Sequence, residues 1–282
     1  MKLGDLKLHI ASGGKYWLDG GTMYGVIPKV LWEKEAPADE KNRIELETNC
    51  PLIQVKDKWV LLDTGCGDKF GDKEKEIYKL KGKGNLVQSL KEFGLTPEDI
   101  DYVIPTHLHF DHIGGGTQYD AKGNLVPTFP NARYIFQRGE WENALANHGV
   151  MKRTYLKENL LPLEQAKVIE FVDGDKEILP GVSVVKTGGH TPDHQIVVLG
   201  LGRQKAVFMG DLIPTRSHLP YAWVMSYDLF PLETLEYKKE ILKKVVTEKW
   251  LVLWDHDPKV PAGYVKEVAL GKFEVSPVET HS

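Results

Sequence analysis

Histidine and aspartate are concentrated in one short segment of this 282-residue chain. The stretch THLHFDHIGGG places His107, His109, Asp111 and His112 within six residues. It follows the apolar run 102–104, which is typical of a short buried strand. Imidazole and carboxylate groups are the ligands that Zn, Mn, Fe and Co accept in hydrolytic sites. Four such groups on a loop after a strand predict a metal site, whereas a lone His would indicate a polar loop.

Three more short apolar runs also end in His or Asp. His190 follows the run 182–186, Asp211 follows 206–209, and His256 follows 250–254. One such placement is common by chance, but three are not. Together they supply the additional ligands that a two-metal site needs.

The remaining pattern indicates two groups of strands, each followed by helices. Strands are predicted at 6–10, 44–55, 59–62, 102–104, 133–137, 182–186, 195–199, 206–209 and 250–254, and helices at 85–93, 140–147 and 232–246. This order predicts an α/β fold with two sheets packed face to face and helices outside. Because the candidate ligands run from residue 107 to residue 256, we expect residues 1–282 to form a single domain.

Composition excludes several classes of protein. The 36 Lys+Arg against 40 Asp+Glu argue against a nucleic-acid binder that depends on positive charge. Two cysteines, Cys50 and Cys66, are too few for a disulfide scaffold. Charged residues interrupt the N-terminus, and no apolar run approaches the roughly 18 residues of a membrane span. We therefore expect a cytoplasmic protein with no nucleic-acid or membrane partner.

The complete pattern resembles the ligand set of the metallo-β-lactamase superfamily, in order and in placement, over nearly the whole chain. The resemblance implies a four-layer αββα sandwich. It implies two divalent metal ions, with Zn favoured and Mn, Fe or Co also acceptable to the ligands. The residues implied are His107, His109 and His190 for the first ion, Asp111, His112 and His256 for the second, and Asp211 as the bridge between them.

A narrower resemblance is to the quorum-quenching N-acyl-homoserine lactonases, with methyl parathion hydrolase-like enzymes as close relatives. It depends on the segments 20–32, 211–215 and 223–228 together with the ligand set. The best-described lactonases carry a Tyr three residues after the bridging Asp, where this chain has Pro214. That Tyr would polarise the lactone carbonyl, so another residue must replace it. Tyr221, Tyr227 and His218 are the candidates.

The resemblance implies a hydrolase in which a metal-bridging hydroxide opens a lactone ring, with Asp111 delivering the proton to the leaving oxygen. The alternative is a phosphotriesterase or another ester or thioester hydrolase on the same site. A thioesterase of the glyoxalase II kind is less consistent with the apolar N-terminal stretch, because that branch needs cationic residues. A diiron redox protein is less consistent with this chain, because such relatives usually replace one ligand His with Glu and carry a flavin domain, and this set contains no Glu.

An apolar substrate pocket should cover the metal site. The predicted lining residues are Met23, Tyr24, Phe110, His218, Tyr221 and Trp223. They would hold the apolar chain of a small-molecule substrate. The apolar N-terminal stretch that includes Met23 and Tyr24 could instead form a homodimer contact or part of the core, and a homodimer is expected from the resemblance.

The other polar residues near the motifs are predicted to have supporting roles. His194 is expected to orient a ligand or its loop, Asp63 to hold a turn near the metals, and Asp255 to act as a structural acceptor. His9, His148 and His281 are predicted to be surface or structural residues.

Overall fold

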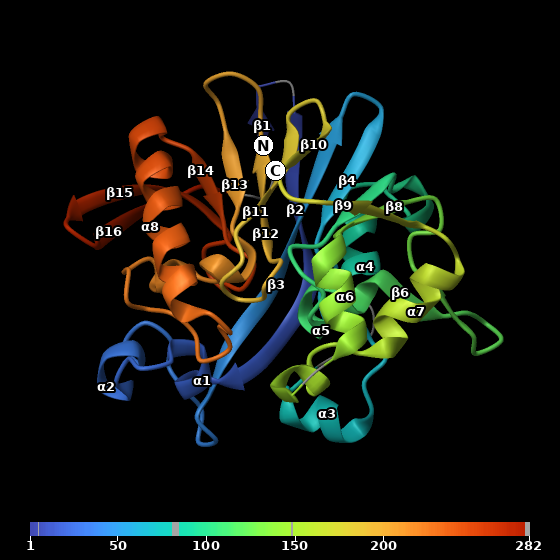
Figure 1. Cartoon of the computed structure of the whole chain (residues 1–282), viewed down its shortest axis with the longest axis horizontal. Helices are drawn as coiled ribbons and strands as arrows, with labels where there is room; N and C mark the ends of the chain where they lie inside the picture. The colour runs from blue at the N-terminus through green and yellow to red at the C-terminus, as the bar shows by residue number, and fades with distance from the viewer. Residues whose placement is uncertain (5, 81–84, 148, 280–282) are drawn as a thin grey trace.

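The computed structural model describes residues 1–4, 6–80, 85–147 and 149–279, so His148 and His281 lie outside the described residues. Two seven-stranded sheets form its centre, and helices flank them (Figure 1). The first sheet has the order β1 (Lys2–Leu3), β2 (Leu6–Asp19), β3 (Arg43–Val55), β4 (Lys58–Leu62), β5 (Tyr102–Ile104), β8 (Arg133–Gln137) and β9 (Ile169–Val172). The second has the order β10 (Lys176–Leu179), β11 (Val182–Lys186), β12 (Gln195–Leu199), β13 (Ala206–Phe208), β14 (Leu251–Leu253), β15 (Ala262–Ala269) and β16 (Lys272–Pro277). A separate two-stranded sheet joins β6 (Thr117–Tyr119) to β7 (Leu125–Pro127).

Helices α4 (Asn85–Glu92), α6 (Arg138–Ala146), α7 (Lys157–Gln165) and α8 (Pro231–Glu248) lie on the outer faces of the two sheets, and α1 (Gly20–Tyr24), α2 (Lys29–Trp32) and α3 (Asp72–Ile77) lie beyond one end of the strands (Figure 1). A further α-helix is α5 (Phe110–Ile113). Short 3-10 helices are η1 (Pro97–Asp99), η2 (Gly114–Gly116), η3 (Gly149–Arg153), η4 (Gly210–Leu212) and η5 (Arg216–His218). In Figure 1, α8 lies on the left side of the sandwich, beside β15 and β16, and α4, α6 and α7 lie on the right side. In the part of the chain that the structure describes, no helix combines the length and the apolar character that a membrane span requires.

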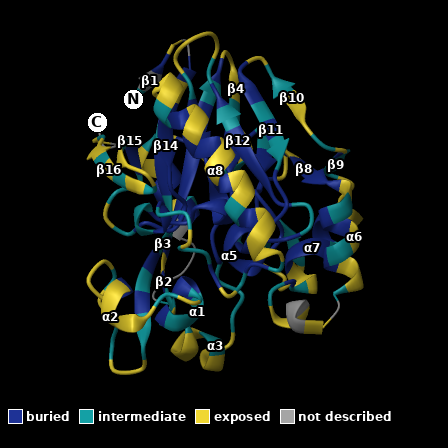
Figure 2. Cartoon of the chain, turned by 60° about the vertical axis from the view of Figure 1, so that its left-hand side comes forward, coloured by how far each residue is buried: buried dark blue, intermediate teal, exposed yellow. Residues whose placement is uncertain are grey.

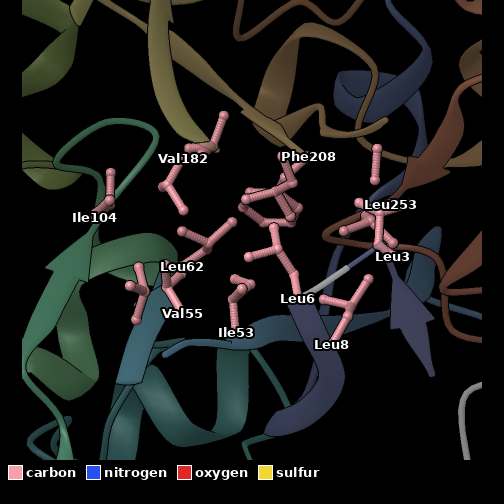
Figure 3. Close-up of a cluster of buried hydrophobic side chains, with 14 of the residues drawn as sticks. Leu3, Leu6, Leu8, Ile53, Val55, Leu62, Ile104, Val182, Phe208 and Leu253 are labelled. Carbon is pink, nitrogen blue, oxygen red and sulfur yellow. The ribbon is translucent and has the colours of Figure 1, made fainter. Parts of the chain in front are cut away.

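Three hydrophobic layers hold this arrangement together. Between the sheets, Leu6, Leu8 and Ile53 of the first sheet pack with Phe208 and Leu253 of the second (Figure 3). A second cluster joins the outer face of the first sheet to α4, α6 and α7, and a third joins the second sheet to α8. The outward face of α8 is exposed (Figure 2). The predicted αββα sandwich is therefore confirmed.

The N-terminal strand is much longer than its sequence pattern indicated. The prediction covered residues 6–10, whereas β2 continues to Asp19 and pairs with β3 along its length. The register shifts by one residue between Ser12 and Lys15, opposite Asn49 and Glu47. Such a β-bulge interrupts the alternation from which a strand is recognised. The pair Gly13-Gly14 at this bulge had concealed the second half of the strand.

Candidate metal centre

The strands that precede the candidate ligands end at the same edge of the sandwich. β13 and β14 are parallel, and β11 runs in the same direction as β13 because each is antiparallel to β12. In the first sheet, β5 lies parallel to β4 and β8. The loops after β5, β11, β13 and β14 bring all seven predicted ligands into two adjacent clusters.

The first cluster contains His107, His109, His190 and Asp211, all of them buried. One ligand atom from each lies within 4.8 Å of the others. Nε2 of His190 is 3.2 Å from Nδ1 of His109 and 3.0 Å from Oδ2 of Asp211. Ring nitrogens and a carboxylate therefore converge on one point, as ligands of a cation do.

The second cluster contains Asp111, His112 and His256, which are also buried. Nε2 of His256 is 3.3 Å from Nε2 of His112 and 3.8 Å from Oδ2 of Asp111. Asp211 lies between the two clusters. Its Oδ2 faces His190 at 3.0 Å, and its Oδ1 faces His256 at 3.2 Å.

The chemistry of these groups fits divalent cations. Among the described residues, Nε2 of His107 and Oδ1 of Asp211 are buried without a hydrogen-bond partner, and such atoms are rare unless a ligand satisfies them. Burial lowers the pKa of His107 and His109 well below the usual value, so both imidazoles are neutral. Although burial opposes it, the charges of His190, His112 and His256 lower the pKa of Asp211 well below its usual value. Neutral imidazole and ionised carboxylate are the forms that bind metals, so His190, His112 and His256, whose pKa values the nearby carboxylates raise, would release a proton when an ion binds.

Two of the imidazoles are oriented by acceptors behind them. Nδ1 of His190 donates to Asp228 at 2.9 Å, and Nδ1 of His256 donates to the carbonyl of Glu47 at 2.9 Å. Each contact leaves Nε2 directed into the site, as in many metal centres.

His112 has two acidic partners. Its Nδ1 lies 2.9 Å from both Asp63 and Asp255, which are fully buried. Asp63 also accepts from the backbone N–H of Thr106 at 2.6 Å, so it connects the loop before the ligands to His112. Burial opposes a charge on His112, but the carboxylates of Asp111, Asp211, Asp63 and Asp255 raise its pKa well above the usual value. The structure thus places both acids behind a ligand. Asp63 holds the turn through Thr106, whereas neither carboxylate oxygen of Asp255 has a hydrogen-bond partner among the described residues, so its role as an acceptor stays a prediction.

Two further buried side chains connect the ligand loops. Nε2 of His194 accepts from the backbone N–H of Asp211 at 3.2 Å, and its Nδ1 lies 2.7 Å from the hydroxyl of Thr187. Glu140 of α6 accepts from the N–H of Leu108 at 3.1 Å and from the hydroxyl of Thr191 at 2.7 Å. Leu108 lies between two ligands and Thr191 follows a third. Glu140 therefore fixes the loop after β5 relative to the loop after β11.

Glycine permits the close packing of two of these loops. A Cβ at Gly115 would collide with the carbonyl of Thr64, so the end of the ligand segment can approach the turn after β4 only without a side chain. Gly189, next to His190, has φ of +84°, a conformation that glycine adopts readily. A Cβ there would also contact Thr234 of α8 at 2.6 Å.

A cavity of about 230 Å³ opens over the two clusters. Its floor is formed by His109, Asp111, His190, Asp211 and His256. Its other lining residues are Tyr16, Leu18, Met23, Tyr78, Phe110, Arg153, Thr154, Met225 and Tyr227. Most of these side chains are apolar or aromatic, so the cavity suits a ligand with an apolar part. Of the predicted pocket residues, Met23 and Phe110 are among them.

Three of the other four predicted pocket residues lie in the layer around this cavity. Tyr24 bonds to Ser217 at 2.7 Å and stacks on His218 with 4.7 Å between ring centroids. Nε2 of His218 donates to the carbonyl of Met23 at 2.9 Å, so the ring supports a cavity residue from behind. Trp223 packs edge-on against Tyr24.

Tyr221 is directed to the far side of the second sheet. Its hydroxyl donates to Glu267 at 3.2 Å, and its ring packs against Phe273. Tertiary packing of separate segments determines the partners of Tyr24, His218, Tyr221 and Trp223. The distance of a residue from a motif along the sequence does not reveal these partners.

One residue of the site was not predicted from the sequence. Tyr16 of β2 is fully buried, and its hydroxyl donates to Oδ2 of Asp111 at 2.7 Å. Burial and the charge of Asp111 raise the pKa of Tyr16 well above its usual value, so the phenol keeps its proton. The only signal in the sequence was an aromatic residue beyond the Gly-Gly pair, which by itself does not predict a site.

Comparison with known proteins decides the family. The family model of the Metallo-beta-lactamase superfamily matches residues 43–256. The chain belongs to the metallo-beta-lactamase superfamily. The matched range contains all seven ligand positions of the two clusters. This chain is thus a metal-dependent hydrolase of that superfamily.

Relatives of this superfamily member include lactonases. An N-acyl homoserine lactonase of Bacillus cereus is 31% identical over 266 residues, which cover 89% of this chain and 93% of the relative. A solved structure of a probable metal-dependent hydrolase from Staphylococcus aureus is 33% identical, with a TM-score of 0.90 over 100% of both chains. Another solved structure is that of an N-acyl homoserine lactone hydrolase with the product N-hexanoyl-L-homoserine bound at its catalytic metal centre. It is 26% identical, with a TM-score of 0.69, and the match covers 90% of this chain and 94% of that chain.

Proposed function

We propose that this protein is a dinuclear metallohydrolase that opens the ring of lactones, with N-acyl-homoserine lactones as the substrate class. The observation that carries the proposal is the position of Asp211, whose two oxygens face His190 at 3.0 Å and His256 at 3.2 Å. A carboxylate between two clusters of ligands is suited to bridge two ions. The similarity to curated N-acyl homoserine lactonases supports the substrate class.

His107, His109 and His190 would hold one ion, and Asp111, His112 and His256 the other, with Asp211 shared by both. Zinc is the favoured metal, and Mn, Fe or Co would suit the same ligands. Two such ions would lower the pKa of a water molecule toward neutrality and offset the charge that develops on the carbonyl oxygen.

Asp111 is the proton carrier in this proposal. Its carboxylate lies on the cavity floor, where it would accept the proton of the attacking water and return it to the leaving ring oxygen. The lactone needs this step because an alkoxide is a poor leaving group. A hydrogen bond from Tyr16, another lining residue, holds Oδ2 of Asp111 there.

The cavity supports a substrate with a short apolar chain. Leu18, Met23, Phe110 and Met225 provide an apolar wall, and the volume of about 230 Å³ lies below the common range of about 300–1,000 Å³ for ligand pockets. A lactone ring with a short acyl chain would fit inside, whereas a longer chain would extend past Arg153, an exposed residue at the cavity.

A lactone panel measured by the release of acid tests this proposal. The metal-loaded protein should hydrolyse N-acyl-homoserine lactones, and Met23→Trp, which fills the apolar wall, should raise KM more for long acyl chains than for a lactone without a chain. Val268→Trp, at an exposed position of β15, is the matched control. Faster hydrolysis of aryl phosphotriesters than of every lactone would favour the phosphotriesterase alternative and overturn the proposed substrate class.

A homodimer and a cytoplasmic location, both expected from the sequence, stay predictions. Light scattering of the purified protein and fractionation of the source cells would check them.

A further inference from the structure

Tyr16 reaches the candidate centre from a strand that carries none of the seven proposed ligands. It lies on β2, and its hydroxyl is 2.7 Å from Oδ2 of Asp111. The same oxygen is 3.2 Å and 3.3 Å from the two ring nitrogens of His256. Nδ1 of His256 already donates to the carbonyl of Glu47, and Oδ2 of Asp111 is the nearest acceptor to the phenol. Tyr16 thus touches two of the three residues in the second cluster.

The bulge in β2 explains how this side chain enters the site. Residues 6, 8 and 10 of the strand face the core between the sheets. One extra residue between Ser12 and Lys15 reverses the alternation for the residues that follow. Tyr16 therefore leaves the core between the sheets and joins the cluster that contains Met23 and Phe110 beside the cavity.

The three residues predicted to replace the Tyr that lactonases carry at the position of Pro214 have other partners. The hydroxyl of Tyr221 bonds to Glu267, and the hydroxyl of Tyr227 bonds to Thr22. His218 donates to a backbone carbonyl. Among the described tyrosines, Tyr16 is the one whose hydroxyl is hydrogen-bonded to a proposed metal ligand.

We propose that Tyr16 is a positioning residue for the second metal ion, acting through Asp111. Its hydrogen bond holds Oδ2 and leaves Oδ1 of Asp111 on the side of His112, whose Nε2 lies 3.8 Å away. When a donor already holds one carboxylate oxygen, the side chain loses less rotational freedom on binding a cation through the other oxygen. The inference rests on the proposed dinuclear function. It predicts an effect on the second ion and none on the first, because the ligands of the first ion make no hydrogen bond with Tyr16 in the described structure.

Tyr16→Phe is the sharpest test because it keeps the buried ring and removes only the hydroxyl. The metal-free variant and the parent protein would be titrated with Zn²⁺ against a chromophoric chelator, and circular dichroism would check that both are folded. The second equivalent of Zn²⁺ should bind about 10–100-fold more weakly in the variant, while the first equivalent keeps its affinity. Tyr24→Phe is the matched control. Tyr24 belongs to the same hydrophobic cluster as Tyr16, and its hydroxyl bonds to Ser217.

Equal affinity of both equivalents in Tyr16→Phe and the parent protein would overturn the inference, as would an equal loss for the two equivalents. A parent protein that binds only one equivalent would overturn it together with the dinuclear centre. The titration needs no substrate. A protein that binds two ions as predicted but opens no lactone would therefore contradict the proposed function and leave the role of Tyr16 standing.

Discussion

Asp228 holds His190 in place through a hydrogen bond of 2.9 Å between its Oδ1 and Nδ1 of the imidazole. Oδ2 of the same carboxylate accepts from the N–H of Met225 at 3.1 Å. The ring is thereby fixed with Nε2 toward Asp211. The segment that carries Met225 also forms part of the cavity wall. One carboxylate therefore links the orientation of a proposed ligand to the shape of the pocket.

Replacing this carboxylate should weaken the metal centre without unfolding the protein. We expect Asp228→Asn to reduce metal affinity or kcat/KM by about 10–100-fold. The amide oxygen of Asn is a weaker acceptor than a carboxylate oxygen, so it would hold the imidazole N–H less firmly. Elemental analysis after dialysis and lactone kinetics would measure the change. Asp173→Asn is the control, since that carboxylate is exposed and pairs with Arg138 at the surface. Equal metal content and kinetics in the two variants would contradict the prediction.

Removing the carboxylate between the two clusters should have the largest effect on function. In Asp211→Ala, both clusters lose a shared ligand, so metal retention and activity should fall together to background. Elemental analysis and a lactone assay on the same preparation would show this. His9→Ala is the control, because His9 lies against Phe93, among residues outside the two clusters. An active Asp211→Ala protein without metal would refute the hydrolytic mechanism.

Glu140 should contribute to stability as well as to the geometry of the ligand loops. It is fully buried and accepts hydrogen bonds from Leu108, Tyr155 and Thr191. In Glu140→Ala these donors lose their acceptor, and we expect the free energy of unfolding to fall by about 2–4 kcal/mol. Urea denaturation of the metal-free protein would measure it. Glu142→Ala, an exposed position on the same helix, should change little. Similar losses in the two variants would argue against the proposed role.

Lys238 should make stability depend on pH. Its side chain is buried in α8, and its Nζ donates to the carbonyls of Pro220 and Trp223, each at 2.8 Å. Burial lowers its pKa from 10.5 to about 7. Between these values the unfolded chain binds a proton that the folded protein does not, so the free energy of unfolding should rise with pH in this window.

Lys238→Met should reduce the slope of the free energy of unfolding against pH by an amount that corresponds to at most one proton. This expectation holds whatever the substitution does to overall stability. Urea denaturation at several pH values between 7 and 10 would measure the slope. Lys239→Met is the control, because Lys239 is exposed and pairs with Glu236. If Lys238→Met keeps the slope of the parent protein, the buried lysine does not titrate as expected.

Local sequence patterns predicted many strands well. The ranges 102–104, 133–137, 182–186 and 195–199 coincide with β5, β8, β11 and β12. These strands contain short runs of buried residues, so their pattern is recognisable without knowledge of their neighbours. By contrast, the hairpin of β15 and β16 was not predicted. Its strands are largely exposed, and their pairing with each other and with β14 defines them more than any apolar run does.

The sequence by itself determined which residues could bind metal ions and that each group of them follows a strand, because ligand chemistry and strand pattern are both local properties. Tertiary structure alone decided which aromatic side chains reach the cavity. Tyr16 meets partners 95 and 240 residues away, Asp111 and His256, and a bulge decides which side of β2 it occupies. Tyr221, close in sequence to Asp211, turns instead to Glu267. Side-chain direction depends on strand register and on the packing of distant segments, neither of which a local pattern contains.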